Sequence, residues 1–254
     1  MAEEAPRHYI DLDKYGAVDS LPQRWDSAVA KLKADTLHKH GIVPWWIGTM
    51  QYRLTTAFKE KNGAKILKLS AEIGHYIADA HVPLHASSNH NGQHTNQHGI
   101  HGFWESRLPE LLAEKEWNFF LGKAAYIPNT AGFIWQRVKE SAAAADTVLR
   151  LEKELSQRFP PDKKFAFESR NGLVVRQYST TFTTAYNTAL NGMVERRMQQ
   201  SIQAVASFWL TAWIDVGQPD LSTLTGAAFT QKDVETFEAL NKAWRNNNTL
   251  GREH

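Results

Sequence analysis

Seven of the 11 histidines lie in one short stretch of the chain, between His75 and His101. Within this stretch His75 and Asp79 are four residues apart, and His101 and Glu105 repeat that spacing. A spacing of four places two side chains on one face of a helix, about one turn apart. Histidine nitrogens and carboxylate oxygens are common metal ligands, so two such pairs predict a metal site.

The residues around the first pair leave room for another group to approach closely, and they include a further candidate ligand. Ala71, Gly74 and Ala78 are small and flank the pair on its helix. Pro83 is expected to end that helix, which places His85 just beyond its C-terminal end, able to bend back toward the pair. The two pairs and His85 together supply five candidate ligands on a rigid scaffold.

The other histidines of the stretch are expected to have other roles. His90, His94 and His98 lie in a polar loop, residues 87–99, and we expect them to be solvated or to support the ligands. His81 lies on another helix face and is expected to be structural. An isolated His-x-x-x-Asp is more often a surface pair than a ligand set, but two such pairs within 31 residues favour the metal.

Helical periodicity covers most of the chain. Apolar residues recur every three or four positions between flanking proline and glycine signals. The predicted helices cover residues 25–40, 44–61, 64–82, 101–117, 133–159 and 194–213. These segments predict an all-α fold.

Two features interrupt or extend this helical pattern. Residues 165–175 contain two short β-like runs around Asn171-Gly172, which predicts one small hairpin. Gly217-Gln218-Pro219 ends the last long helix, so we expect one domain over residues 1–217 and a helical extension over residues 218–254. The extension is expected to hold an amphipathic helix with Val234, Phe237 and Leu240.

The composition excludes several classes of function. The sequence has no cysteine, which excludes thiol catalysis, disulfides and thiolate metal sites. The net charge is +2, which gives no strong signal for nucleic acid or membrane. No run approaches the ~18 apolar residues of a membrane span, and the opening residues lack the pattern of a signal peptide. There is also no Gly-x-Ser-x-Gly elbow of a serine hydrolase.

The spacing of the candidate ligands resembles a known motif, that of the zinc-dependent phospholipase C / S1-P1 nuclease superfamily. The matching segments are His75-x-x-x-Asp79, Pro83-Leu-His85 and His101-Gly-Phe-Trp-Glu105. The opening His8-Tyr-Ile-Asp11 is similar to the family's upstream His-aromatic-x-Asp segment. The helical pattern onward to about residue 215 is compatible with the family fold, whereas Val82 stands where nuclease members often have Gln.

The resemblance implies a fold and a set of ligands. The family has an all-α fold with a trinuclear zinc centre and hydrolyses phosphodiester bonds. By the resemblance, a first zinc would be held by His8, His75 and Asp79, and a second by His85, His101 and Glu105. Asp79 would also bridge to a third zinc, which places Asp79 and His75 at the catalytic centre.

Some family ligands have no counterpart here. These are an amino-terminal Trp, a nearby His, and an Asp that the family uses as general base. Only seven residues precede His8, so the resemblance implies a family domain that lacks its N-terminal part and holds zinc, three ions at most. It also implies a secreted or periplasmic protein.

Two functions are compatible with these residues. The first is a zinc-dependent phosphodiester hydrolase that uses metal-activated water on a phospholipid or a single-stranded nucleic acid. Trp45, Trp46, Tyr76 and Phe103 are candidates to line its cleft, although aromatic residues at helical spacing are more often core residues. The alternative is a non-catalytic helical module, a truncated relative that zinc merely stabilises.

Overall fold

The computed structural model describes residues 4–170 and 172–224, together with residues 231, 234, 235, 238, 239 and 242. Within these residues the chain is mostly helical, with one two-stranded antiparallel hairpin, which confirms the predicted all-α class and its small hairpin. Among the described helices, none has the length and apolar character needed to cross a membrane. The expected helix around Val234, Phe237 and Leu240 falls largely outside the described residues.

The main elements follow one another closely along the chain. They are α1 (Trp25–Leu32), α2 (Ala34–His40), α3 (Val43–Lys59), α4 (Gly63–His81), α5 (Ile100–Gly102), α6 (Leu108–Glu116), α7 (Thr130–Arg158), α8 (Pro161–Lys164), β1 (Phe165–Arg170), β2 (Leu173–Tyr178), α9 (Thr180–Ala189) and α10 (Met193–Ile214). Short 3-10 turns include Ala5–His8 and Pro83–Ala86, and a π-helical turn, Phe103–Arg107, joins α5 to α6.

The ends of the site-bearing helix have identifiable causes. Asn62 caps α4, because its side chain accepts a hydrogen bond from the backbone N–H of Lys65 at 3.0 Å. At the other end, Val82 is extended, as expected for a residue before proline. Pro83 then opens the 3-10 turn that carries His85. The sequence signals for α4 therefore match its observed bounds within one or two residues.

One predicted helix is divided in the structure, and one observed helix was not predicted. The segment expected as one helix over residues 25–40 is divided into α1 and α2 at Lys33, whose φ of 67° no α-helix accommodates. Helix α9 was not predicted, because five of its ten residues are threonine, which has low helical propensity. Its buried Phe182 and Tyr186 and its Ser179 cap hold it in place.

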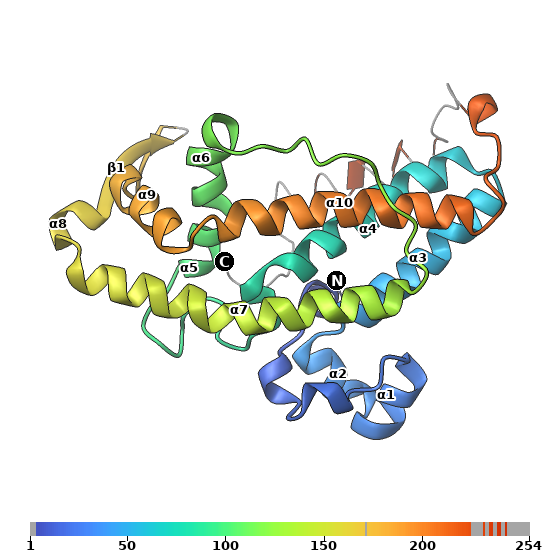
Figure 1. The fold of residues 1–254 in the computed structure, drawn as a ribbon, viewed down its shortest axis with the longest axis horizontal. Coiled ribbons are helices and arrows are strands. Elements are labelled where there is room, and N and C mark those ends of the chain that lie inside the picture. The colour runs from blue at the N-terminus through green and yellow to red at the C-terminus, as the bar shows by residue number, and fades with distance from the viewer. Residues whose placement is uncertain are drawn as a thin grey trace.

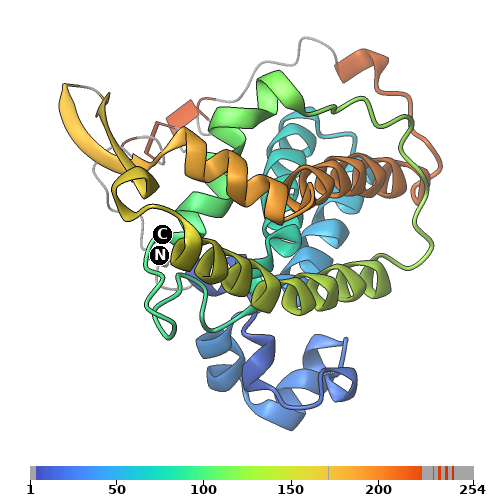
Figure 2. The ribbon, with the colours of Figure 1, turned by 60° about the vertical axis from the view of Figure 1, so that its left-hand side comes forward.

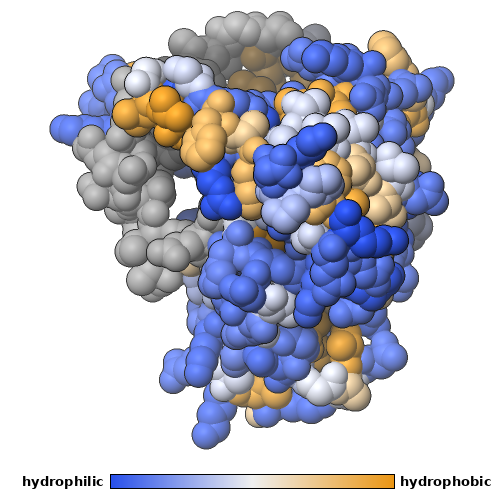
Figure 3. Space-filling model, turned by 90° about the vertical axis from the view of Figure 1, so that its left-hand side faces the viewer, coloured by the Kyte–Doolittle hydropathy of each residue, from blue (hydrophilic) through white to orange (hydrophobic). Residues whose placement is uncertain are grey.

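Helix α4 lies among the other long helices. It packs against α3, α7 and α10, and α7 and α10 run along the long axis of the molecule (Figure 1). The first two helices form a small lobe to one side, and the hairpin projects from the opposite part of the molecule (Figure 2). The end face shown in Figure 3 is largely hydrophilic, with hydrophobic patches in its upper part.

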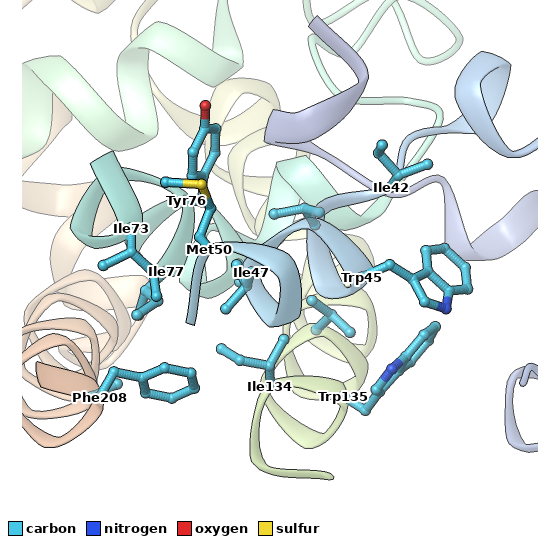
Figure 4. Packing of buried hydrophobic residues seen from close by; sticks show 14 of the residues in the cluster. Ile42, Trp45, Ile47, Met50, Ile73, Tyr76, Ile77, Ile134, Trp135 and Phe208 are labelled. Carbon is cyan, nitrogen blue, oxygen red and sulfur yellow. The ribbon is translucent and has the colours of Figure 1, made fainter. Parts of the chain in front are cut away.

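Two hydrophobic clusters meet near the C-terminal end of α4. The larger includes Ile73, Ile77 and Phe208, whose side chains converge in Figure 4, while the hydroxyl of Tyr76 points away from them. The smaller begins at Leu84 and includes Phe103 with residues of α6, α7, α9 and α10. The histidine-rich stretch thus runs from the larger hydrophobic cluster to the smaller one.

Burial in the larger cluster stabilises α4. Ile73 is fully buried, so Ile73→Ala should lower the free energy of unfolding by about 2–5 kcal/mol in urea titrations. Leu67 on the same helix is 60% exposed, and Leu67→Ala should change the free energy of unfolding by less than about 0.5 kcal/mol. Similar effects of the two substitutions would show that the burial assigned to α4 is wrong.

Candidate metal centre

Three of the predicted ligands meet between the N-terminal 3-10 turn and α4. His8 Nδ1 lies 2.9 Å from Asp79 Oδ2 and 3.0 Å from His75 Nε2. His75 Nε2 lies 3.4 Å from the same Asp79 oxygen. All three ligand atoms therefore surround one point, and we refer to His8, His75 and Asp79 as the first triad.

A polar network outside the first triad orients His8. Its Nε2 atom faces Glu4 Oε1 at 3.5 Å, and the Tyr76 hydroxyl donates to the same Glu4 oxygen at 2.5 Å. Arg7 pairs with the other oxygen of Glu4. Burial raises the pKa of Glu4, but the Tyr76 hydrogen bond and the charges of Arg7 and His8 outweigh it and lower the pKa. The ionised Glu4 thus faces His8 Nε2, and a metal ion on Nδ1 would leave the His8 proton on the side of Glu4.

The other three predicted ligands form a second triad, His85, His101 and Glu105. Glu105 Oε2 lies 3.1 Å from His101 Nε2 and 3.4 Å from His85 Nε2. The side chain of His101 is only 2% exposed, whereas that of His75 in the first triad is 61% exposed. The second triad is therefore shielded from solvent, and the first is open on the side of His75.

The π-helical turn carries Glu105 in the second triad. The N–H of Leu108 bonds to the carbonyl of Phe103, five residues back. Pro109 has no N–H to give to the carbonyl of Glu105, and its ring crowds that carbonyl, which favours a wider turn. The sequence analysis predicted a helix here, and this wider turn was not foreseen.

A direct contact joins the two triads. His85 Nδ1 donates to the backbone carbonyl of His8 at 2.6 Å, and the N–H of Ile10 donates to the carbonyl of His85 at 2.9 Å. With its proton on Nδ1, His85 has its lone pair on Nε2, the atom that faces Glu105. The second oxygen of Asp79, Oδ1, lies 3.9 Å from His85 Nδ1, so this carboxylate of the first triad also places negative charge beside the second.

The donor atoms fit a metal ion. In tetrahedral zinc sites with bonds of about 2.0–2.1 Å, neighbouring ligand atoms are roughly 3.3 Å apart. The separations of 2.9–3.4 Å between ligand atoms within the two triads are close to that value. The structure therefore brings together all six predicted ligands in two groups that could each hold a metal ion, while their role as ligands stays a prediction.

The charges of the second triad also favour a cation. Burial by itself would lower the pKa of His85, but the neighbouring Glu105 and Asp79 carboxylates raise it. Burial would likewise raise the pKa of Glu105, yet His101 and His85 hold it well below its ordinary value. A positive charge beside Glu105 is therefore stabilised, whether protons or a metal ion supply it.

The remaining histidines of the stretch lie elsewhere. His81 is buried, its Nδ1 donates to the Ile77 carbonyl at 2.7 Å, and burial lowers its pKa to about 3. His94 and His98 are exposed. The ring of His90 lies 6.2 Å from that of His101, close enough to support that ligand.

Sequence reasoning missed a groove beside the first triad. This groove, with a volume of 810 Å³, is lined by α3, α4 and the N-terminal turn, including His8, His75 and Tyr76. The ring of Trp46 lies in it with the Arg7 guanidinium 3.9 Å and that of Arg53 5.0 Å from its centre. Of the four aromatic residues expected in a cleft, Trp46 and Tyr76 line this groove, whereas Trp45 and Phe103 are core residues.

Comparison with protein-family models, curated proteins and solved structures finds no match. The functional argument therefore depends on the residues and their geometry. The resemblance stated from the sequence stays a prediction.

Glu4 should influence metal binding although it is not a predicted ligand. In Glu4→Gln the negative charge that faces His8 Nε2 is lost, so zinc affinity should fall by about 10–100-fold in a competition titration with a chelator. Glu60→Gln, which removes an exposed carboxylate paired with Lys65, should leave it unchanged. Equal affinity in Glu4→Gln and the parent chain would contradict the orientation assigned to His8.

The raised pKa of His85 should make the stability of the metal-free chain depend on pH. A folded-state pKa above the ordinary 6.5 stabilises the fold fully below that pH, and the contribution is lost as pH rises through the folded value. Chemical denaturation of metal-free protein should therefore show falling stability between about pH 6 and pH 8. Zinc should reverse the trend, because fewer protons compete with it at higher pH.

The variant His85→Gln provides the control for this pH series. It removes the titrating group, so its metal-free stability should fall less steeply over the same range. A slope equal to that of the parent chain would assign the pH dependence to another group.

Proposed function

We propose that this chain is a zinc-dependent phosphodiester hydrolase related to the phospholipase C / S1-P1 nuclease superfamily. The observation that carries the proposal is the convergence of the six candidate ligands in two adjacent triads. His8 and His85, one from each triad, are joined by a direct hydrogen bond of 2.6 Å. Two neighbouring metal sites are the arrangement that many phosphoesterases use.

The donor set supports zinc among the metal ions. Each triad offers histidine nitrogen and carboxylate oxygen and no thiolate, which suits zinc better than the oxygen-only sites of magnesium or calcium. Each triad also provides three protein ligands. Catalytic zinc sites use three protein ligands and keep a position for water or substrate, whereas structural sites use four.

The chemistry follows from the metal and the residues around it. Bound zinc supplies a water of lowered pKa and neutralises charge on a phosphoryl group. Glu4 fixes the orientation of His8, and the His8 carbonyl fixes that of His85, so the ligand nitrogens are held in place before metal binds. The groove beside His75, with Arg7 and Arg53, would hold the rest of the substrate.

Both substrate classes named by the resemblance, phospholipid and single-stranded nucleic acid, are carried into this proposal. Hydrolysis of single strands that weakens steeply with salt would favour nucleic acid. Faster turnover on vesicles than on dispersed lipid would favour phospholipid. A secreted or periplasmic location is likewise proposed from the resemblance alone.

The decisive experiment is Asp79→Asn in the zinc-reconstituted chain. The substitution keeps the size of the side chain but removes the charge that offsets repulsion between neighbouring dications. Zinc content should fall, and hydrolysis of an activated phosphodiester such as bis(p-nitrophenyl) phosphate should fall by more than the ~100-fold upper limit for residues that only orient ligands. Asp26→Asn, an exposed change on α1, should retain zinc and turnover.

Metal removal separates the two functions considered. Zinc should raise the melting temperature of the parent chain, and a chelator should reverse the effect. Zinc binding and stabilisation without phosphodiester turnover would favour the non-catalytic module. Less than about one zinc per chain, with a melting curve unchanged by chelator, would contradict both.

A further inference from the structure

The β1–β2 hairpin exposes an unusual amount of apolar surface. The exposed fractions are 74% for Phe167, 69% for Leu173 and 74% for Val174. Phe167 and Val174 lie on one face of the hairpin and Leu173 on the other, and Figure 2 shows the hairpin projecting from the helical body. Apolar side chains gathered at the end of a projecting element indicate a contact surface.

The two faces of the hairpin differ in their surroundings. Glu168 and Arg170 lie on one face, where Glu168 pairs with Arg107 and Arg170 with Glu110 on α6. The opposite face is open to solvent toward the tip and carries no acidic residue. In the observed register it consists of Phe165, Phe167 and Ser169 opposite Tyr178, Arg176 and Val174.

The unpaired charge on the hairpin is positive. Among residues 163–178, Lys164 pairs with Glu152, Arg170 with Glu110 and Glu168 with Arg107, whereas Lys163 and Arg176 have no carboxylate partner among the described residues. On the open face, Arg176 lies against the Phe165 ring, with its guanidinium carbon 3.6 Å from the ring centre. This arrangement keeps a cation beside the exposed Phe167.

We propose that the tip of this hairpin docks on the surface of an anionic lipid bilayer. Apolar side chains that enter the interface, with arginine and lysine beside them at the level of the phosphates, are the features that hold peripheral proteins on membranes. Phe167 and Val174 on the open face, even with Leu173 on the other, offer much less than the ~800 Å² per partner of a standard protein interface. A lipid surface needs no such area and no complementary shape.

The base of the hairpin contacts the π-helical turn that carries Glu105 of the second triad. The ring of Tyr178 stacks on Phe103 with 3.8 Å between centres, and Arg107 Nε donates to the Tyr178 carbonyl at 3.1 Å. Phe103 and Arg107 flank Glu105 in the same π-helical turn. Docking through the tip would therefore fix the orientation of the second triad relative to the lipid. The proposal does not depend on the metal or on hydrolysis.

Vesicle sedimentation of the full chain tests the proposal without measuring turnover. The parent chain should bind phosphatidylcholine vesicles that contain phosphatidylserine, and bind pure phosphatidylcholine vesicles much more weakly. Added salt should reduce the binding. The double variant Phe167→Ser, Val174→Ser should bind the anionic vesicles at least about tenfold more weakly.

A second hydrophobic substitution controls for a general loss of apolar surface. Leu67 is 60% exposed on α4, and Leu67→Ser should bind vesicles like the parent chain. Melting curves should show that the tip variant is folded. Binding of the tip variant equal to that of the parent, or no binding of the parent to anionic vesicles, would overturn the proposal. So would self-association of the parent that the tip substitutions abolish, because the tip would then be a contact between copies.

Discussion

The hydrogen bond from His85 Nδ1 to the His8 carbonyl is the interaction on which the candidate centre depends. It joins the N-terminal turn to the exit of α4, residues that are 77 positions apart in the sequence. The return bond from Ile10 N–H to the His85 carbonyl makes the contact reciprocal. Because His8 belongs to one triad and His85 to the other, this pair of bonds sets the position of each triad relative to the other.

Burial explains why the two triads differ. His101 and His85 lie beneath the smaller hydrophobic cluster, where an unpaired carboxylate such as that of Glu105 would be costly. His75 lies at the surface next to the groove, where ligands can exchange with solvent. One half of the centre is therefore suited to holding a cation permanently, and the other to meeting a substrate.

Local sequence signals predicted most of the fold, but packing supplied the rest. Proline, glycine and asparagine signals placed both ends of α4, the C-terminal end of α7 and the hairpin predicted over residues 165–175, because these residues act on the backbone next to them. Helix α9 was missed because its threonines oppose the helix that its buried aromatic side chains stabilise. The break at Lys33 left no signal, since the apolar spacing continues through it.

The candidate site was predictable to a similar extent. The spacing of four residues and the proline before His85 pointed to five candidate ligands that the structure brings together, while their role as ligands stays a prediction. His8 was found only through the resemblance, because nothing in its own neighbourhood places it near residue 79. The orienting role of Glu4 was missed, although its position four residues before His8 was visible. Roles that depend on contacts between distant segments cannot be inferred from local spacing.

The π-helical turn lets one continuous helical segment contact both the second triad and the hairpin. Each residue of an α-helix advances about 100° around the axis, so a turn that contains an extra residue shifts the direction of everything after it. His101 and Glu105 belong to the second triad, while Arg107 at the end of the turn and Glu110 after it reach the hairpin. A deletion of Ser106, the residue between Glu105 and Arg107, would restore an ordinary helical phase. It would turn Glu110 away from the hairpin while leaving each candidate ligand in the sequence.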